Sequence, residues 1–82
     1  MNLYSLTYFN RSHQDERITE TLTNGSHIDN IKQGDKWISL YAYSNYVVEL
    51  TYDPVENRIE DAQAISLDLY CERWGMELRS EL

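Results

Sequence analysis

The side chains that could carry out chemistry in this chain are one cysteine, Cys71, and two histidines, His13 and His27. A cysteine nucleophile needs a base beside it, and a zinc site needs several Cys or His ligands at short spacing. Neither histidine lies near Cys71 in the sequence, and a whole predicted strand separates the two histidines. We therefore expect Cys71 to be a small buried hydrophobe and both histidines to lie in surface loops.

Carboxylate pairs and glycine-rich loops add no catalytic arrangement. Glu60 and Asp61 are adjacent on a predicted strand, where neighbouring side chains point to opposite faces and do not easily share a proton. The three glycines, Gly25, Gly34 and Gly75, lack the spacing of a phosphate-binding loop. The sequence therefore predicts a protein that is not an enzyme and that uses no metal or cofactor.

Negative charge says more about the function of this chain than its potential catalytic residues do. The chain carries 14 Asp and Glu against 7 Lys and Arg, which gives a formal net charge of −7. Within thirteen positions lie five acidic residues: Glu49, Asp53, Glu56, Glu60 and Asp61. Such a field repels nucleic acid and anionic lipid and attracts a basic protein surface. The alternative is a solvated acidic surface that keeps a small protein soluble.

The elements that must position these side chains belong to one small domain, residues 1–82. No run approaches the roughly 18 apolar residues of a membrane span. The N-terminal sequence also lacks the basic opening and long apolar stretch of a signal peptide. We expect a cytoplasmic protein with no membrane partner.

The stretch from Trp37 to Tyr52 predicts an antiparallel hairpin, because two β-rich runs flank a turn at Ser44 and Asn45. Pairing Tyr43 with Tyr46 sets the register, and side chains then alternate between the two faces. The aromatic face holds Trp37, Ser39, Tyr41, Tyr43, Tyr46, Val48, Leu50 and Tyr52. The opposite face holds Ile38, Leu40, Ala42, Val47, Glu49 and Thr51.

A third strand is predicted over Arg58 to Ile65, after a turn in which Pro54 and Asn57 suit the required backbone angles. With Asp53 opposite Arg58, this strand adds Ile59, Asp61, Gln63 and Ile65 to the aromatic face and Glu60, Ala62 and Ala64 to the other. A helix that starts near Glu56 is the competing interpretation, because this stretch contains enough helix formers.

The flanking segments complete an α+β fold. Asn2 to Phe9 and Arg17 to Thr23 are predicted as strands from their β-branched and aromatic content. Ser26 predicts the cap of a short helix that Gly34 ends, although a short strand also fits. Ser66 predicts the cap of an amphipathic C-terminal helix with apolar residues at helical spacing: Leu67, Tyr70, Cys71, Trp74 and Leu78. We expect an antiparallel sheet of about four or five strands with this helix on one face.

The aromatic face has two interpretations. Its Trp and Tyr side chains could form the core beneath the C-terminal helix. Alternatively, the helix packs on the face with Ala42, Ala62 and Ala64, where small side chains allow a close approach. The aromatic face would then be left for a partner, since Tyr and Trp are enriched at interface hot spots.

The opening segment, LTYFNRSHQDE, resembles the start of the immunity proteins that neutralise ribonuclease colicins and cloacin. The matching residues are Leu6, Thr7, Tyr8, Phe9, Asn10, Arg11 and Ser12. In that family a first strand ends in an aromatic-Phe pair and runs into a polar turn. Its members bind the basic nuclease domain of their toxin through acidic and aromatic side chains on an antiparallel sheet. The resemblance implies an inhibitor of the same class.

Together these signals predict a non-enzymatic inhibitor of the immunity or antitoxin kind, which masks the basic surface of a nuclease or another nucleic-acid-binding protein. We expect no direct binding to nucleic acid. A phage-encoded inhibitor of a defence nuclease, such as an anti-CRISPR protein, and a homodimeric accessory domain are the alternatives. The candidate partner-binding residues are Asp53, Glu56, Glu60, Asp61, Trp37, Tyr41, Tyr43 and Tyr46.

Overall fold

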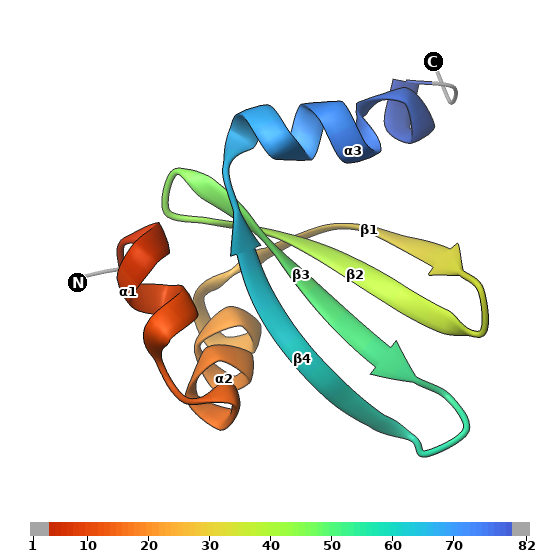
Figure 1. The fold of residues 1–82 in the computed structure, drawn as a ribbon, viewed down its shortest axis with the longest axis horizontal. Helices are drawn as coiled ribbons and strands as arrows, with labels where there is room; N and C mark the ends of the chain where they lie inside the picture. The colour runs from red at the N-terminus through yellow and green to blue at the C-terminus, as the bar shows by residue number, and fades with distance from the viewer. Residues whose placement is uncertain (1–3, 80–82) are drawn as a thin grey trace.

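The computed structural model describes residues 4–79, which form one four-stranded antiparallel sheet with helices on both faces (Figure 1). The elements are α1 (Leu6–Arg11), α2 (Gln14–Asn24), β1 (Ser26–Gln33), β2 (Lys36–Tyr43), β3 (Tyr46–Asp53), β4 (Arg58–Ile65) and α3 (Leu67–Arg79). The strands lie side by side in chain order. Helices α1 and α2 cover part of one face, and α3 crosses the other. The α+β class expected from the sequence is confirmed.

The central hairpin, β2 and β3, has the predicted register. Tyr43 pairs with Tyr46 next to the turn, and Trp37 pairs with Tyr52 at the far end. Ser44 in the turn takes a positive φ of 55°. This left-handed conformation suits the tight connection between two twisted strands.

Strand β4 is the predicted third strand, and its first residue, Arg58, pairs with Asp53. The turn between them contains Asn57 with a positive φ of 54°, as its residue type favours. The competing helix that would start near Glu56 does not form.

A β-bulge in β4 overturns the predicted faces of the rest of that strand. Ile59 pairs with Tyr52 and Asp61 pairs with Thr51, so Glu60 is an extra residue without a cross-strand partner. An extra residue shifts the two-residue alternation by one position. The side chains that this shift places on the aromatic face are Ala62 and Ala64, and those placed on the opposite face are Asp61, Gln63 and Ile65.

The two strands predicted ahead of the sheet are wrong, because the chain forms helices there. In the described part of Asn2 to Phe9, Tyr4 and Ser5 precede α1 and Leu6 to Phe9 lie inside it. Arg17 to Thr23 lies inside α2. The segment that resembles the immunity proteins, Leu6 to Ser12, is therefore a helix and its end instead of a strand and turn.

Burial of Phe9 explains why this region forms helices instead of the predicted strands. Phe9 in α1 is fully buried, and its ring centre lies 5.5 Å from that of Tyr43 and 6.0 Å from that of Tyr46. Ala62 and Ala64 are small enough to let α1 and α2 approach the same face of the sheet. Packing on this face outweighs the local β propensity of the Thr, Ile and Tyr residues.

Residues 26–33 form the edge strand β1, so the short helix predicted from Ser26 is wrong and the alternative strand is confirmed. A two-residue turn at Gly34 and Asp35 joins β1 to β2, with Gln33 opposite Lys36. Gly34 has a positive φ of 67°, a conformation in which glycine carries no side-chain strain. Gly34 had been interpreted as the end of a helix, but it lies in the turn that connects two antiparallel strands.

Helix α3 starts as predicted, with Ser66 Oγ accepting a hydrogen bond from the backbone N–H of Leu69 at 3.2 Å. The core between α3 and the sheet contains Trp74 of the helix and four residues of the strands, Ile38, Leu40, Val47 and Ile65. The expectation that Cys71 is buried is wrong, because the cysteine points away from this core and is exposed. The side chain of Leu78 lies outside the part of the chain that the structure describes.

Candidate protein-binding surface

The aromatic face of the sheet is core at one end and surface at the other. Near the Ser44 turn, Tyr43 and Tyr46 are only 2% and 3% exposed beneath α1 and α2. Burial raises the pKa of both hydroxyls. At the far end Trp37 is 38% exposed and its neighbour Tyr52 is half-buried. The C-terminal helix α3 packs on the opposite face, so the interpretation that placed the aromatic face beneath it is wrong. The aromatic face is nevertheless only half uncovered, because α1 and α2, which were predicted as strands, pack on its other half.

The exposed half forms a surface that we call the aromatic shelf, a shallow hollow lined by Asn30, Trp37, Ser39 and Tyr52. Trp37 in β2 lies directly opposite Tyr52 in β3, and Asn30 in β1 lies opposite Ser39 in β2. The far end of the sheet extends beyond α1 and α2 (Figure 1). The backbone positions that carry these side chains are set by the pairing of three strands.

Several polar groups of the shelf form hydrogen bonds within the fold. Asn30 Oδ1 accepts from Ser39 Oγ at 2.7 Å and from His27 Nε2 at 2.9 Å, since an amide oxygen can only accept. Tyr52 donates its hydroxyl hydrogen to Asn57 Oδ1 at 2.6 Å. The indole N–H of Trp37 and the amide NH₂ of Asn30 have no partner among residues 4–79. Two N–H donors are therefore left free beside the rings.

Of the four acidic residues predicted to face a partner, Asp53 is the most enclosed. Its Oδ1 accepts from the backbone N–H of Val55 at 2.9 Å and of Glu56 at 3.3 Å, and its Oδ2 lies 3.7 Å from Lys36 Nζ. Burial alone would raise the pKa of Asp53, but the two backbone N–H groups and the Lys36 ammonium outweigh it and lower this pKa. Asp53 thus shapes the β3–β4 turn.

Two further predicted acids are neutralised within the fold. Glu60 lies 2.5 Å from Lys36 Nζ, and Asp61 lies 3.0 Å from the guanidinium of Arg17 in α2. Of the predicted cluster, only Glu56 is exposed and outside any ion pair with a described residue. The predicted acidic patch is thus largely an internal ion-pair system.

A net negative surface nevertheless remains. The described cations that form no ion pair are Arg11, Lys32 and Arg58. They are outnumbered by the described acids that likewise form no ion pair: Asp15, Glu16, Glu20, Asp29, Asp35, Glu56, Asp68 and Glu72. These acids are spread over α2, β1, α3 and the two turns at the far end of the sheet instead of forming one patch.

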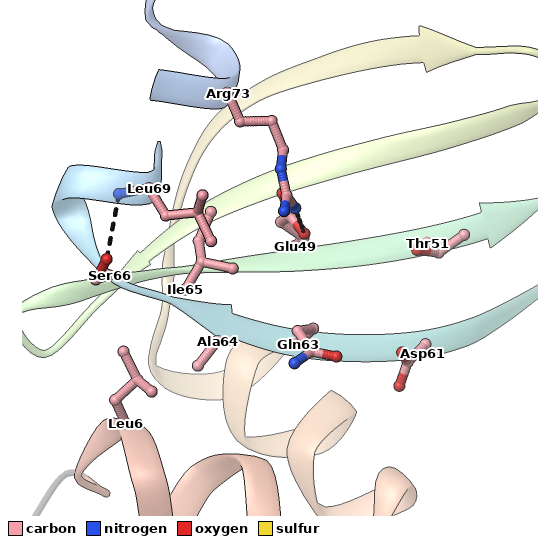
Figure 2. A pocket seen from close by; sticks show the side chains of 10 residues that line it. All are labelled: Leu6, Glu49, Thr51, Asp61, Gln63, Ala64, Ile65, Ser66, Leu69 and Arg73. Atoms are coloured by element: carbon pink, nitrogen blue, oxygen red, sulfur yellow. Dashed lines mark hydrogen bonds and ion pairs between the residues drawn. The ribbon is translucent and has the colours of Figure 1, made fainter. Parts of the chain in front are cut away.

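A second hollow lies between α3 and the β3–β4 part of the opposite face (Figure 2). Its walls combine apolar side chains with the ion pair between Arg73 and Glu49, whose atoms lie 2.8 Å apart at the closest. Glu49 also accepts a hydrogen bond from Trp74 Nε1 at 2.6 Å. Because the Glu49 carboxylate already accepts from two side chains that hold α3 on the sheet, we assign this hollow a structural role.

The shelf only partly matches the candidates chosen from sequence. Trp37 lies on it, and Tyr41 lies beside it with its ring 5.3 Å from His27. Sequence reasoning missed Asn30, because a helix was expected there. Tyr52 was missing from the candidate residues even though the predicted register had placed it beside Trp37. The register alone could therefore have identified it.

The remaining chemical groups are dispersed. His13 lies in the loop before α2, as expected, whereas His27 is exposed on strand β1. Within the described residues, no three His, Cys, Asp or Glu side chains form a metal-binding group. None of the helices in residues 4–79 has both the length and the apolar character to cross a membrane. Comparisons with protein-family models, curated proteins and solved structures give no match for the chain.

Proposed function

We propose that this protein is a non-enzymatic inhibitor that binds a basic, nucleic-acid-handling protein through the aromatic shelf. The observation that carries this proposal is the exposure of Trp37 beside Tyr52 on an uncovered half of the sheet. Side chains of this kind offer a large contact area at low entropic cost and are frequent interface hot spots. Rigid strands hold both rings, so binding would require little ordering of the shelf.

Negative charge supplies the second part of the proposed function. The acids outside ion pairs outnumber the free cations among the described residues, so the surface field favours encounter with a basic partner. This field would act on the association rate, whereas the shelf would determine the dissociation rate. Tyr43 and Tyr46 are excluded as anchors because they are buried.

The test is affinity capture from the native host with wild type, Trp37→Ala and Leu67→Ala, followed by mass spectrometry. Leu67 is an exposed apolar residue on α3 and provides the matched control. We expect wild type and Leu67→Ala to capture the same basic protein and Trp37→Ala to lose it. Equal capture by all three proteins, or capture of an acidic protein, contradicts the proposed function.

A gel shift tests the same proposal from the opposite side. Because the net charge of −7 opposes phosphate, the protein alone should not retard DNA or RNA, even at about 50 mM salt where such contacts are strongest. Tight retardation would make the protein a ligand of nucleic acid and would overturn the inhibitor assignment.

A further inference from the structure

We propose that the aromatic shelf binds a proline-rich segment of the partner in the polyproline II conformation. This inference rests on the proposed function, because the segment belongs to the partner. Three properties of the shelf carry it: the arrangement of the two rings, the free hydrogen-bond donors beside them, and the local charge.

The rings of Trp37 and Tyr52 stand on neighbouring antiparallel strands at directly opposite positions. Side chains of such a pair project from the same face with their Cβ atoms roughly 5 Å apart. Two aromatic side chains at this separation form an apolar slot, which is how aromatic-lined grooves hold successive pyrrolidine rings. A polyproline II segment is already ordered before it binds, so little conformational entropy is lost.

The hydrogen-bonding groups of the shelf match the same ligand. Trp37 Nε1 and Asn30 Nδ2 are donors without a partner among the described residues, whereas Asn30 Oδ1 already accepts from Ser39 and His27. A proline-rich segment has backbone carbonyl acceptors but few N–H donors, because proline has no N–H. The two free N–H donors of the shelf can therefore bind carbonyl groups of such a segment.

Local charge distinguishes this segment from a basic one. Lys32 pairs with Trp37 across the β1–β2 ladder and forms no ion pair with a described residue. A lysine beside the slot disfavours Lys-rich or Arg-rich peptides at this position. The basic surface of the partner would therefore face the acids elsewhere on the molecule, and the shelf would receive a neutral segment.

The experiment is an NMR titration of the indole N–H signals with an acetylated, amidated proline decamer. A glycine-serine decamer is the control peptide. Trp74 provides an internal reference, because it is 5% exposed and its N–H is bound to Glu49. We expect the Trp37 signal to move to saturation with the proline peptide only, while the Trp74 signal stays in place.

Variants separate the ring and donor contributions. Asn30→Asp retains an oxygen for Ser39 and His27 but loses the free NH₂, so we expect the proline peptide to bind about tenfold more weakly. Trp37→Phe lacks the indole N–H signal, so its binding is followed at the backbone N–H of Ser39, where we expect a similar loss. Leu67→Ala should bind like wild type. Folding of each variant is checked from the unchanged Trp74 signal.

Three results would overturn this inference: no movement of the Trp37 signal, equal movement with both peptides, or movement with protein concentration alone, which would identify a second copy as the occupant. The first two would leave the proposed function to be decided by affinity capture, whereas a second copy on the shelf would contradict the proposed function as well. Conversely, peptide binding without capture of a basic protein would refute the inhibitor assignment and retain the proline site.

Discussion

The two edges of the sheet differ in how their outward-facing backbone groups are protected. At β4, the amide of Asn10 in α1 accepts from the N–H of Ala64 at 2.7 Å and donates to its C=O at 2.9 Å. The guanidinium of Arg17 in α2 donates to the C=O of Ala62 at 2.6 Å. Side chains of the two N-terminal helices thus take the place of a fifth strand.

The β1 edge is protected by its own residues. Asp29 Oδ1 accepts from the N–H of Asn30 at 2.8 Å, and Lys32 places a charge further along the strand. A bulge interrupts the ladder between His27 and Asp29. Charges and bulges of this kind discourage pairing with another chain.

The difference shows that the edge strands of one sheet can be protected in two ways. Other elements can cover the backbone groups of an edge, or the residues of the strand itself can discourage pairing. The β4 edge depends on the docking of α1 and α2, so any change that loosens these helices uncovers hydrogen-bonding groups. The β1 edge remains protected as long as its sequence is unchanged. Substitutions at the two edges should therefore differ in both the size and the kind of their effects.

The largest effect is expected from Asn10→Ala, which removes both bonds to Ala64. Ala64 is 3% exposed, so water does not readily replace the amide. We expect the free energy of unfolding to fall by about 3 kcal/mol, measured by urea denaturation. Gln63→Ala changes an exposed neighbour on β4 and is the control, for which we expect less than about 0.5 kcal/mol. Equal losses would refute the assigned role of Asn10.

A smaller loss is expected from Arg17→Met, which keeps an apolar stem but removes the bonds to Ser12, Asp61 and Ala62. Asp61 is 45% exposed and can be solvated, so we expect about 2 kcal/mol in a thermal unfolding experiment. Arg17→Lys should recover less than half of this, because a single ammonium cannot reproduce the guanidinium fork. Full recovery by lysine would show that charge alone matters.

The far end of β4 should give an acid-dependent effect, because Asp53 fixes the turn that leads into this strand. The pKa of Asp53 is lower in the folded chain than its usual value of 3.8. Its contribution to stability is therefore complete above 3.8 and is lost as the pH falls through the lower folded value. Unfolding at a series of acid pH values should show a shallower decline for Asp53→Asn. An identical decline in both proteins would contradict this assignment.

The smallest effect on stability, and a different kind of effect, is expected from Asp29→Val combined with Lys32→Val. Both positions lie on an exposed edge, so the free energy of unfolding should change by less than about 0.5 kcal/mol. Removal of both charges should instead produce concentration-dependent association in sedimentation experiments. The same change of charge at Glu72 and Arg11, away from the edge, should leave the protein monomeric. A monomeric β1 variant would show that the bulge alone is sufficient protection.

The hairpin and the C-terminal helix were predictable because their determinants are local. The β-rich runs around Ser44 set one register, and Ser66 forms the cap that its residue type indicates. The N-terminal helices were not predictable in this way, because Asn10 and Arg17 stabilise them through bonds to residues more than forty positions away. Secondary-structure propensity depends on neighbouring residues in the sequence and does not reveal such bonds.

The same limit applied to the candidate surface. Trp37 was predicted and is exposed, whereas Tyr43 and Tyr46 were predicted beside it and are buried, because the segments that cover them, α1 and α2, were predicted as strands. Asp53 illustrates the corresponding error for charge. A sequence gives the number of acids, but the lysine that neutralises one of them comes from another strand.

The bulge at Glu60 also determines where this chain can change in length. Removal of Glu60 would join Ile59 directly to Asp61 and restore a regular ladder, so every side chain from residue 61 to residue 65 would keep its present face. Removal of any single residue from 61 to 64 would instead reverse part of the strand and bring polar groups into the core. Among related sequences, deletions in this strand should therefore be found at Glu60, where shortening the chain breaks the ion pair with Lys36 but leaves the core side chains in place.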